Sequence, residues 1–152
     1  MDKQSNINIK RFIDTFENLA RLERRNQTLM GIKKSEARVL LCIEHLSREK
    51  DYRVSVSNIS KTLSITSPTT TELVKNLTDK GYIERYVNEN DKRFVEIILT
   101  DSGKKILHDI NEYFDVLFSG LIEKLGKQQS ELLIELLNEV NIYFNEWYSK
   151  MN

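Results

Sequence analysis

The chain has 152 residues, of which 39% are hydrophobic and 30% charged, which suits one domain with its own core and argues against a multidomain enzyme. The single cysteine excludes an intrachain disulfide and favours a reducing, cytoplasmic location. Basic and acidic residues number 23 each, and only five glycines and one proline are present, so a mostly helical protein is favoured over a sandwich or barrel of short strands.

The first predicted element is a long amphipathic helix over residues 9–29. Its apolar residues recur at spacings of three and four, which indicates one buried stripe; they are Phe12, Ile13, Phe16, Leu19 and Leu22. We expect Gly31 to end this helix and Ser35 to cap the next one. The second helix is apolar almost all round from Ala37 to Leu46, so it should form the core of the domain.

Two short helices are predicted after a polar connection at residues 47–53. The first places Val56, Ile59 and Leu63 on one face. The second should begin at Ser67 or Pro68, because serine caps a helix and proline suits its first turn. It buries one face and should end at Gly81; the buried residues are Thr70, Leu73, Val74 and Leu77. Two helices joined by so short a turn form a helix-turn-helix.

A two-stranded hairpin should follow, because the apolar period changes after Gly81 from about 3.6 residues to about 2. One alternating run covers residues 83–87, and a second covers 94–99 with Val95, Ile97 and Leu99 on one face. The charged segment between them, residues 88–93, should form the tip. A hairpin directly after a helix-turn-helix is the wing of a winged-helix lobe, here residues 32–100.

Two long helices should complete the chain. Thr100 is placed to cap the first, which begins at Asp101 and is interrupted at Gly126. Residues 7–30 and 101–150 then form a helical region too apolar for so small a lobe to cover. Residues 1–105 carry 20 basic and 15 acidic side chains, whereas 106–152 carry 3 and 8, which indicates two surfaces with different roles.

The outward face of the helix after Pro68 is polar and rich in hydroxyls. Such side chains suit the major groove of DNA, because hydroxyls and amides hydrogen-bond base edges and a threonine methyl packs on thymine. The candidate DNA-binding residues on this face are Ser67, Pro68, Thr69, Thr71, Lys75 and Asn76. The alternative is an ordinary solvated face whose hydroxyls serve only to cap the helix.

The tip of the hairpin carries a second candidate group. Asp91 and Arg93 stand two residues apart in an extended segment, so they point the same way and the carboxylate can orient the guanidinium. An arginine held in this way can enter the minor groove, with Lys92 beside it. The alternative is a surface ion pair with little energetic effect.

Several of these segments together resemble the MarR family of bacterial transcription regulators. The wing signature of that family is similar to Asn90-Asp91-Lys92-Arg93 followed by Leu99-Thr100 and Gly103. The segment from Ser67 to Arg85 resembles the family's recognition helix and first wing strand. The motifs cover about residues 64–106, and the order of elements matches over nearly the whole chain, residues 1–152.

The resemblance implies a homodimer that binds a pseudo-palindromic operator in double-stranded DNA. We expect a repressor, with an activator as the alternative. The outer helices would intertwine, and the expected interface residues are Phe12, Ile13, Phe16, Leu136, Leu137, Phe144 and Trp147. Two lobes related by a two-fold axis would set the half-sites about 10 base pairs apart. A monomeric helical bundle is the alternative.

The sequence offers three candidate means of regulating DNA binding: a small effector, the single cysteine and a metal. The resemblance implies release by a small aromatic or lipophilic effector, but no effector residues can be named from the sequence. Cys42 lies in the apolar second helix, where buried thiols are usually inert. His45 and His108 are far apart and make no metal motif, so neither a metal nor another cofactor is expected.

Two other classes of protein remain as alternatives. A winged-helix module that binds a protein partner and no DNA is supported by the modest charge of residues 55–105, with 8 basic and 7 acidic side chains. An enzyme is disfavoured because the chain lacks the common nucleophile, phosphate-loop and zinc motifs. No signal peptide or apolar stretch of membrane-spanning length is present, so no membrane contact is expected.

Overall fold

The structure is a computed structural model that describes residues 3–25, 27–49, 52–87 and 94–151. Side chains are described from Ile9 onward. The chain divides into two compact units, one reaching to Ile110 and the other beginning at Asn111. The division falls within a helix, so that helix contributes to both units.

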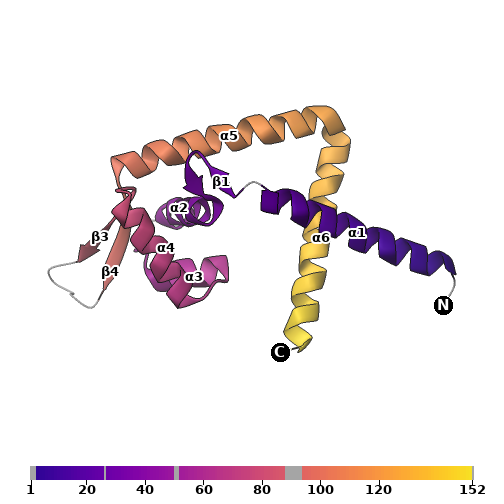
Figure 1. Cartoon of the computed structure of the whole chain (residues 1–152), viewed down its shortest axis with the longest axis horizontal. Coiled ribbons are helices and arrows are strands. Elements are labelled where there is room, and N and C mark those ends of the chain that lie inside the picture. The colour runs from indigo at the N-terminus through magenta and orange to yellow at the C-terminus, as the bar shows by residue number, and fades with distance from the viewer. Residues whose placement is uncertain (1–2, 26, 50–51, 88–93, 152) are drawn as a thin grey trace. The chain divides into compact units, whose positions relative to one another are not determined.

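The described chain is mostly helical with a two-stranded wing, which confirms the predicted fold class (Figure 1). Its helices are α1 (Lys3–Arg25), α2 (Lys34–Ser47), α3 (Val56–Leu63), α4 (Ser67–Asp79), α5 (Asp101–Leu125) and α6 (Lys127–Met151). Its strands are β1 (Thr28–Leu29), β2 (Ile32–Lys33), β3 (Ile83–Val87) and β4 (Val95–Leu99).

The segment before α2 differs from the prediction. Helix α1 ends at Arg25 rather than near residue 29, and β1 and β2 pair as a small antiparallel hairpin. The turn residues Met30 and Gly31 have φ values of 50° and 80°. Two positive φ values give a turn whose twist matches that of the paired strands, so Gly31 closes a hairpin here and does not end a helix.

Helix α2 also begins differently from the prediction. Its N-cap is Lys33, so Ser35 lies inside the first turn and is not the cap. The main-chain N–H of Lys33 donates to Glu36 Oε2 at 3.0 Å. A glutamate three residues into a helix satisfies an orphan N–H in this way, so the acidic side chain takes the capping role expected of the serine.

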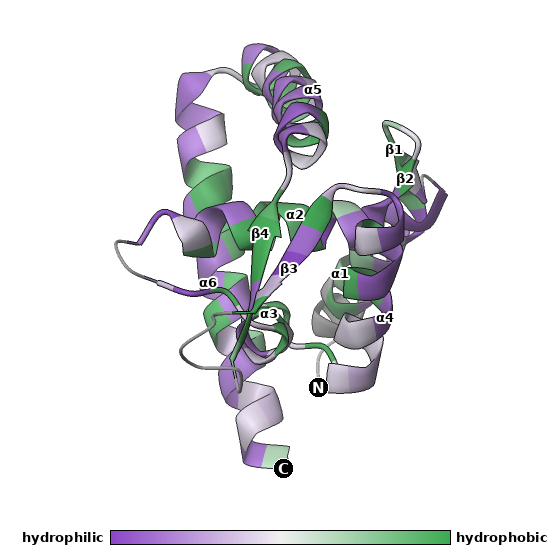
Figure 2. Cartoon of the chain, turned by 90° about the vertical axis from the view of Figure 1, so that its left-hand side faces the viewer, coloured by the Kyte–Doolittle hydropathy of each residue, from purple (hydrophilic) through white to green (hydrophobic). Residues whose placement is uncertain are grey.

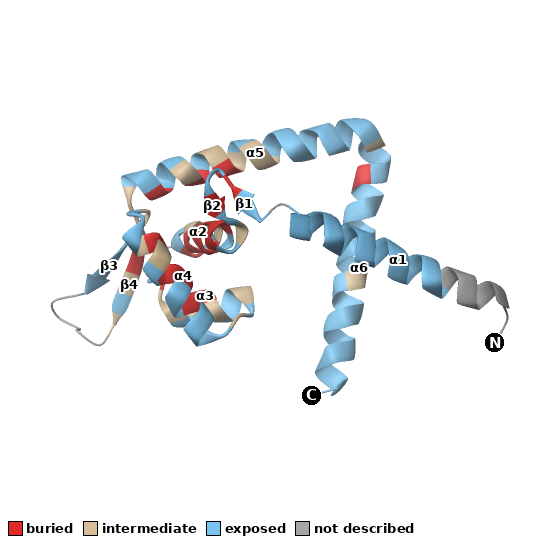
Figure 3. Cartoon of the chain, in the orientation of Figure 1, coloured by how far each residue is buried: buried red, intermediate tan, exposed pale blue. Residues whose placement is uncertain are grey.

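The core of the lobe lies where α2, α3 and α4 pack together (Figure 3). The predicted core helix α2 is confirmed, since six of its apolar side chains are buried: Ala37, Val39, Leu40, Cys42, Ile43 and Leu46. The predicted inner face of α4 is confirmed as well, with Thr70, Leu73, Val74 and Leu77 buried. The apolar spacing in the sequence therefore identified the faces that pack.

Helix α4 begins at Ser67 as predicted, but Thr66 is its N-cap. The hydroxyl of Thr66 accepts the main-chain N–H of Thr69 at 3.4 Å, which leaves Ser67 as the first helical residue. Pro68 lies in the first turn, where its missing N–H has no cost. Gly81, at φ 72°, follows the helix in the left-handed conformation predicted for it.

The wing is an antiparallel pair in which Ile83 faces Leu99 and Val87 faces Val95. The strands agree with the prediction except that β4 begins at Val95 rather than Phe94. Ile97 is the buried residue of β4, and its N–H donates to the Val54 carbonyl at 2.8 Å. The segment before α3 therefore joins the wing to the lobe, a contact that the periodicity did not predict.

Thr100 caps α5, as predicted. Its hydroxyl accepts the N–H of Gly103 at 3.0 Å and donates to the Gly81 carbonyl at 2.6 Å. Its own N–H donates to the Tyr82 carbonyl at 3.1 Å. The start of α5 is therefore bonded to the segment that links α4 with the wing.

The second unit comprises the rest of α5 and helix α6, with the predicted break at Gly126, whose φ is 83°. Hydrophobic and hydrophilic stretches alternate along both helices (Figure 2). Many large apolar side chains of this unit are exposed, among them Leu117, Phe118, Leu132, Leu136, Leu137 and Trp147. Exposed apolar surface of this extent is typical of a protein interface.

Candidate nucleic-acid interface

The outward face of α4 presents most of the residues predicted to bind DNA. Ser67, Pro68, Thr69, Thr71 and Lys75 are exposed, and Asn76 is half-buried. The four buried side chains on the opposite face of the same helix hold its backbone against the lobe. The structure thus brings this group together on one solvent-facing surface of a packed helix.

The threonine hydroxyls of this face already have local partners. Thr71 Oγ1 donates to the Ser67 carbonyl at 2.9 Å, and Thr69 Oγ1 lies 2.8 Å from Thr66 Oγ1. A hydroxyl that donates within its own helix still has lone pairs to accept from a base amino group, and its methyl stays free for contact. These threonines are therefore suited to acceptor and methyl contacts.

The wing residues Asp91, Lys92 and Arg93 lie outside the described residues. The strands that lead to them are described and end at Val87 and begin again at Val95. The proposed orientation of Arg93 by Asp91 therefore stays a prediction.

An ion pair between buried Glu36 of α2 and Lys80, directly after α4, was not predicted from the sequence. Lys80 Nζ lies 2.6 Å from Glu36 Oε2, and the Glu36 side chain is only 1% exposed. Glutamate at the third position of a helix is a signal for capping. The two partners are 44 positions apart in the sequence, so no local pattern indicates the pair.

The environment of Glu36 lowers the pKa of its carboxyl below 4.5. Burial alone raises this pKa, but the hydrogen bonds from Lys80 and from the Lys33 N–H, with the nearby positive charges, outweigh burial. The folded protein therefore binds a proton at this site less readily than the unfolded chain does.

This shift predicts an acid-dependent part of the stability. The stabilisation by ionised Glu36 should be fully present above pH 4.5, the ordinary pKa, and be lost as the pH falls through the lower pKa of the folded state. Urea unfolding of wild type and Glu36→Gln from pH 7 to pH 3 measures it. The difference in the free energy of unfolding between wild type and Glu36→Gln should become smaller below about pH 4.5. A difference that stays constant with pH would contradict the lowered pKa of Glu36.

A cavity of about 560 Å³ lies in the lobe beside α2, the end of α3 and the start of α4. Its walls are largely apolar, and its polar members include Arg38, His45 and Thr69; the other lining residues are Ser35, Leu41, Cys42, Thr62, Leu63, Ile65 and Leu73. A largely apolar cavity with a few polar groups has the composition of a small-molecule site.

The lone thiol, Cys42, lines this cavity and is buried. Burial raises the pKa of Cys42, and a hydrogen bond with Thr62 offsets this only in part. The thiol therefore stays protonated at neutral pH and is a poor nucleophile. This favours the structural role that the sequence indicated over redox sensing.

Cys42 is expected to react slowly with Ellman's reagent at pH 7.5. The folded protein should react at least about 100-fold more slowly than the same protein in urea, because reaction requires an exposed thiolate. Stopped-flow absorbance measures both rates, with glutathione as the free-thiol control. A rate in the folded state close to that of glutathione would overturn this prediction.

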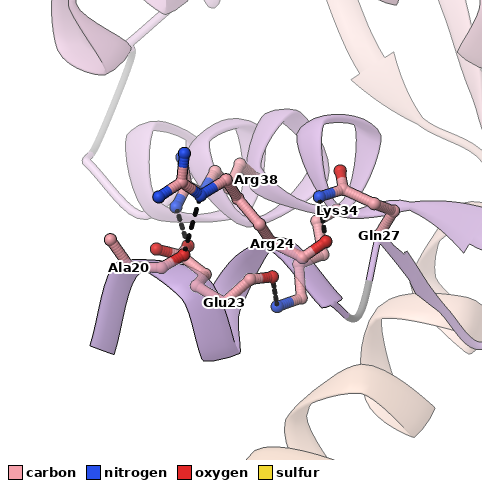
Figure 4. Close-up of polar contacts among 6 residues, drawn as sticks. All are labelled: Ala20, Glu23, Arg24, Gln27, Lys34 and Arg38. Carbon is pink, nitrogen blue, oxygen red and sulfur yellow. Dashed lines mark hydrogen bonds and ion pairs between the residues drawn. The ribbon is translucent and has the colours of Figure 1, made fainter. Parts of the chain in front are cut away.

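Arg38 connects the cavity to the end of α1. Its guanidinium donates to Glu23 Oε1 at 2.7 Å, while Lys34 Nζ donates to the Glu23 carbonyl at 3.2 Å. Figure 4 shows these contacts, together with the bond from Gln27 to the Arg24 carbonyl. These contacts lie at the exposed surface, so each is worth less than about 1 kcal/mol. Together they orient the start of α2 against the end of α1.

The expected interface residues are exposed in the single chain. Phe12 is 66% and Trp147 53% exposed, and the other five predicted members, Ile13, Phe16, Leu136, Leu137 and Phe144, are exposed too. Within the described part of the chain, no group of three His, Cys, Asp or Glu residues is arranged to hold a metal ion. No described helix combines the length and hydropathy needed to cross a bilayer.

A helix-turn-helix whose second helix presents a polar face, followed by a β-hairpin, defines a winged helix-turn-helix protein. Residues 30–93 match the model of the MarR family. This match places the winged helix-turn-helix lobe of the chain in the MarR family of transcriptional regulators. The resemblance on which the sequence prediction rested is thereby confirmed.

A similar curated protein is the HTH-type transcriptional repressor YetL of Bacillus subtilis. It is 24% identical over 110 residues, which cover 72% of this chain and 64% of YetL. The Bacillus subtilis regulator YwhA is 28% identical over 83 residues, 55% of this chain and 60% of YwhA. The chain thus spans about three-fifths of the length of the curated relatives it matches.

Solved structures show the same fold. MepR of Staphylococcus aureus in complex with DNA has a TM-score of 0.62 at 22% identity, covering 94% of this chain and 96% of MepR. A MarR/EmrR family regulator from Acinetobacter has a TM-score of 0.64 at 23% identity, covering 96% and 99% of the two chains. MepR has also been solved bound to ethidium, with a TM-score of 0.55 at 24% identity, covering 88% and 93%.

Proposed function

We propose that this protein is a transcriptional repressor that binds an inverted repeat in double-stranded DNA. The observation that carries the proposal is the exposed polar face of α4 on a helix held by four buried side chains. A helix presented in this way suits the major groove. Support comes from YetL, which is a repressor, and from MepR, which has been solved with DNA.

The protein would bind as a homodimer through α1, α5 and α6. The exposed apolar residues on these helices support this, because a lone chain in water would leave them hydrated. Two copies related by a two-fold axis would present two α4 helices to half-sites about 10 base pairs apart. Ser67, Pro68, Thr69, Thr71, Lys75 and Asn76 would face the major groove, and Lys92 and Arg93 the minor groove.

Selection of bound duplexes from a random pool tests the proposal. The recovered sequences should share an inverted repeat, and fluorescence anisotropy should show one dimer per site with a steep fall in affinity as salt rises. A scrambled duplex of the same length is the control. Equal, weak binding to both duplexes would instead favour a winged-helix module that binds a protein partner.

Arg93→Ala is expected to weaken binding to the selected site by about 1 to 3 kcal/mol without unfolding the protein. The reason is the loss of a cation from the narrow, strongly negative minor groove. Anisotropy titration measures the affinity and circular dichroism the fold. Arg48→Ala removes the same charge from an exposed site directly after α2, where Arg48 pairs with Glu44, and serves as the control. Equal losses in both variants would argue against the wing contact.

A small aromatic or lipophilic effector would release the DNA, and the cavity beside α2 and α4 is its proposed site. The cavity is lined by Thr69 of the DNA-facing helix and by Arg38, whose guanidinium is hydrogen-bonded to Glu23 of α1. A bound effector would therefore contact both Thr69 and Arg38. Screening small aromatic compounds for release of labelled DNA tests this. Leu63→Trp should fill the cavity and abolish release; release that persists unchanged would place the effector elsewhere.

A further inference from the structure

Lys80, directly after α4, is bound to a buried carboxylate. Its position in the sequence suggests a phosphate contact, since it follows the helix that carries Lys75. In the structure its Nζ lies 2.6 Å from Glu36 Oε2, and 39% of the Lys80 side chain is exposed against 1% for Glu36. A lysine that leaves this site for DNA would strand a buried, ionised carboxylate.

We propose that the Glu36–Lys80 pair positions the recognition helix for reading DNA, and that Lys80 is not a phosphate contact. This inference rests on the proposed function and adds positioning residues beneath the DNA-facing surface. Glu36 belongs to α2, the core helix, and its Oε2 also accepts the Lys33 N–H at 3.0 Å. The anchor for Lys80 is therefore itself tied to the start of α2.

The Glu36–Lys80 ion pair at the C-terminal end of α4 can fix the orientation of that helix. The buried apolar residues of the helix are Leu73, Val74 and Leu77, and apolar packing is largely non-directional. An ion pair at hydrogen-bonding distance selects one rotation and one height of the helix. Base reading requires groups placed within a fraction of an ångström of their partners, so a small shift of α4 would reduce discrimination between sequences.

The same anchor also sets where the wing begins. The residue after Lys80 is Gly81, whose carbonyl accepts the Thr100 hydroxyl at 2.6 Å. Tyr82 then accepts the N–H of Thr100 at 3.1 Å. The end of α4, the first wing strand and the start of α5 therefore meet beside the ion pair, so its loss should disturb both DNA-contacting elements.

Glu36→Gln separates a positioning role from a simple charge effect, because the two predict opposite changes in the affinity for DNA. Removing an acidic residue from a DNA-binding lobe should tighten DNA binding if only charge matters. If the pair positions α4, binding to the selected site should weaken about tenfold while binding to a scrambled duplex does not weaken. Glu84→Gln on the exposed face of β3 removes the same charge away from the pair and should not weaken binding to either duplex.

Lys80→Met gives a second readout. A lysine that contacts phosphate contributes about 1 to the slope of log affinity against log salt. We expect that slope on the scrambled duplex to stay unchanged in Lys80→Met, while discrimination between the selected and scrambled duplexes falls about tenfold. If this variant does not fold, Glu36→Gln/Lys80→Met, which leaves no buried charge, takes its place. Circular dichroism and gel filtration check the fold at the assay temperature.

The outcomes separate the two proposals. A wild type that binds both duplexes equally overturns the proposed function, and this inference with it. A wild type that discriminates, beside a Glu36→Gln variant that discriminates equally well, overturns the inference alone. So does a salt slope that falls by about 1 when Lys80 is replaced. Lower thermal stability with unchanged discrimination would show that the pair is only structural, which also overturns the inference.

Discussion

Gly103→Ala is expected to lower the free energy of unfolding by about 3 kcal/mol or more. A Cβ at this position would overlap the carbonyl oxygen of Tyr82 and lie 2.9 Å from its carbonyl carbon. Neither atom can move freely, because the Tyr82 carbonyl accepts the Thr100 N–H at 3.1 Å. The start of α5 would have to separate from the wing. Thermal and urea unfolding followed by circular dichroism measure the effect.

Gly120→Ala is the matched control, since it makes the same change in the same helix. Nothing lies within 4 Å of a Cβ at Gly120, and alanine is the better helix former by up to about 1 kcal/mol. The control should therefore be neutral or stabilising. Equal destabilisation by both variants would show that the close approach at Gly103 is not what requires glycine there.

Leu137→Asp is expected to raise the dissociation constant of the proposed homodimer at least about 100-fold, or about 3 kcal/mol. Leu137 is 52% exposed in the single chain and lies on the apolar stripe of α6 that we assign to the interface. Each dimer would lose two apolar contacts and gain two buried, unpaired charges. Sedimentation velocity over a range of concentrations measures the monomer fraction.

Asn138→Asp adds the same charge at the next position of α6, where the residue is polar and exposed. This variant should remain dimeric, because a charge on the solvent face is not desolvated. A wild type that sediments as a monomer would rule out the proposed dimer. Monomer formation by both variants would point to general repulsion among the acidic side chains of this helix.

The recognition helix was predicted well because its signals are local. The four buried positions of α4, the proline in its first turn and Gly81 after its end lie within 15 residues, so their pattern could be recognised without a distant partner. The same holds for the Thr100 cap, because its hydroxyl accepts the N–H of Gly103, only three residues further along the chain. The wing strands followed from a period-2 pattern, so only the first residue of β4 was misplaced.

The errors occurred where several local solutions compete. Residues 28–33 continue an apolar pattern that a helix would also satisfy, and the hairpin forms because Leu29 and Ile32 are both buried in the lobe. Ser35 and Ser67 were expected to be caps, but Lys33 and Thr66 occupy those positions. A cap depends on the exact residue where the chain leaves extended geometry, which tertiary packing shifts by one or two positions.

The sequence by itself determined the class of fold, the family and the face of α4 that meets solvent, because periodicity and short motifs report on neighbouring residues. Only the tertiary structure decided that Glu36 is buried against Lys80, that Gly103 touches the Tyr82 carbonyl and that a cavity lies beside Cys42. Each of these joins segments far apart in the chain, and such contacts depend on how whole elements pack rather than on any local pattern.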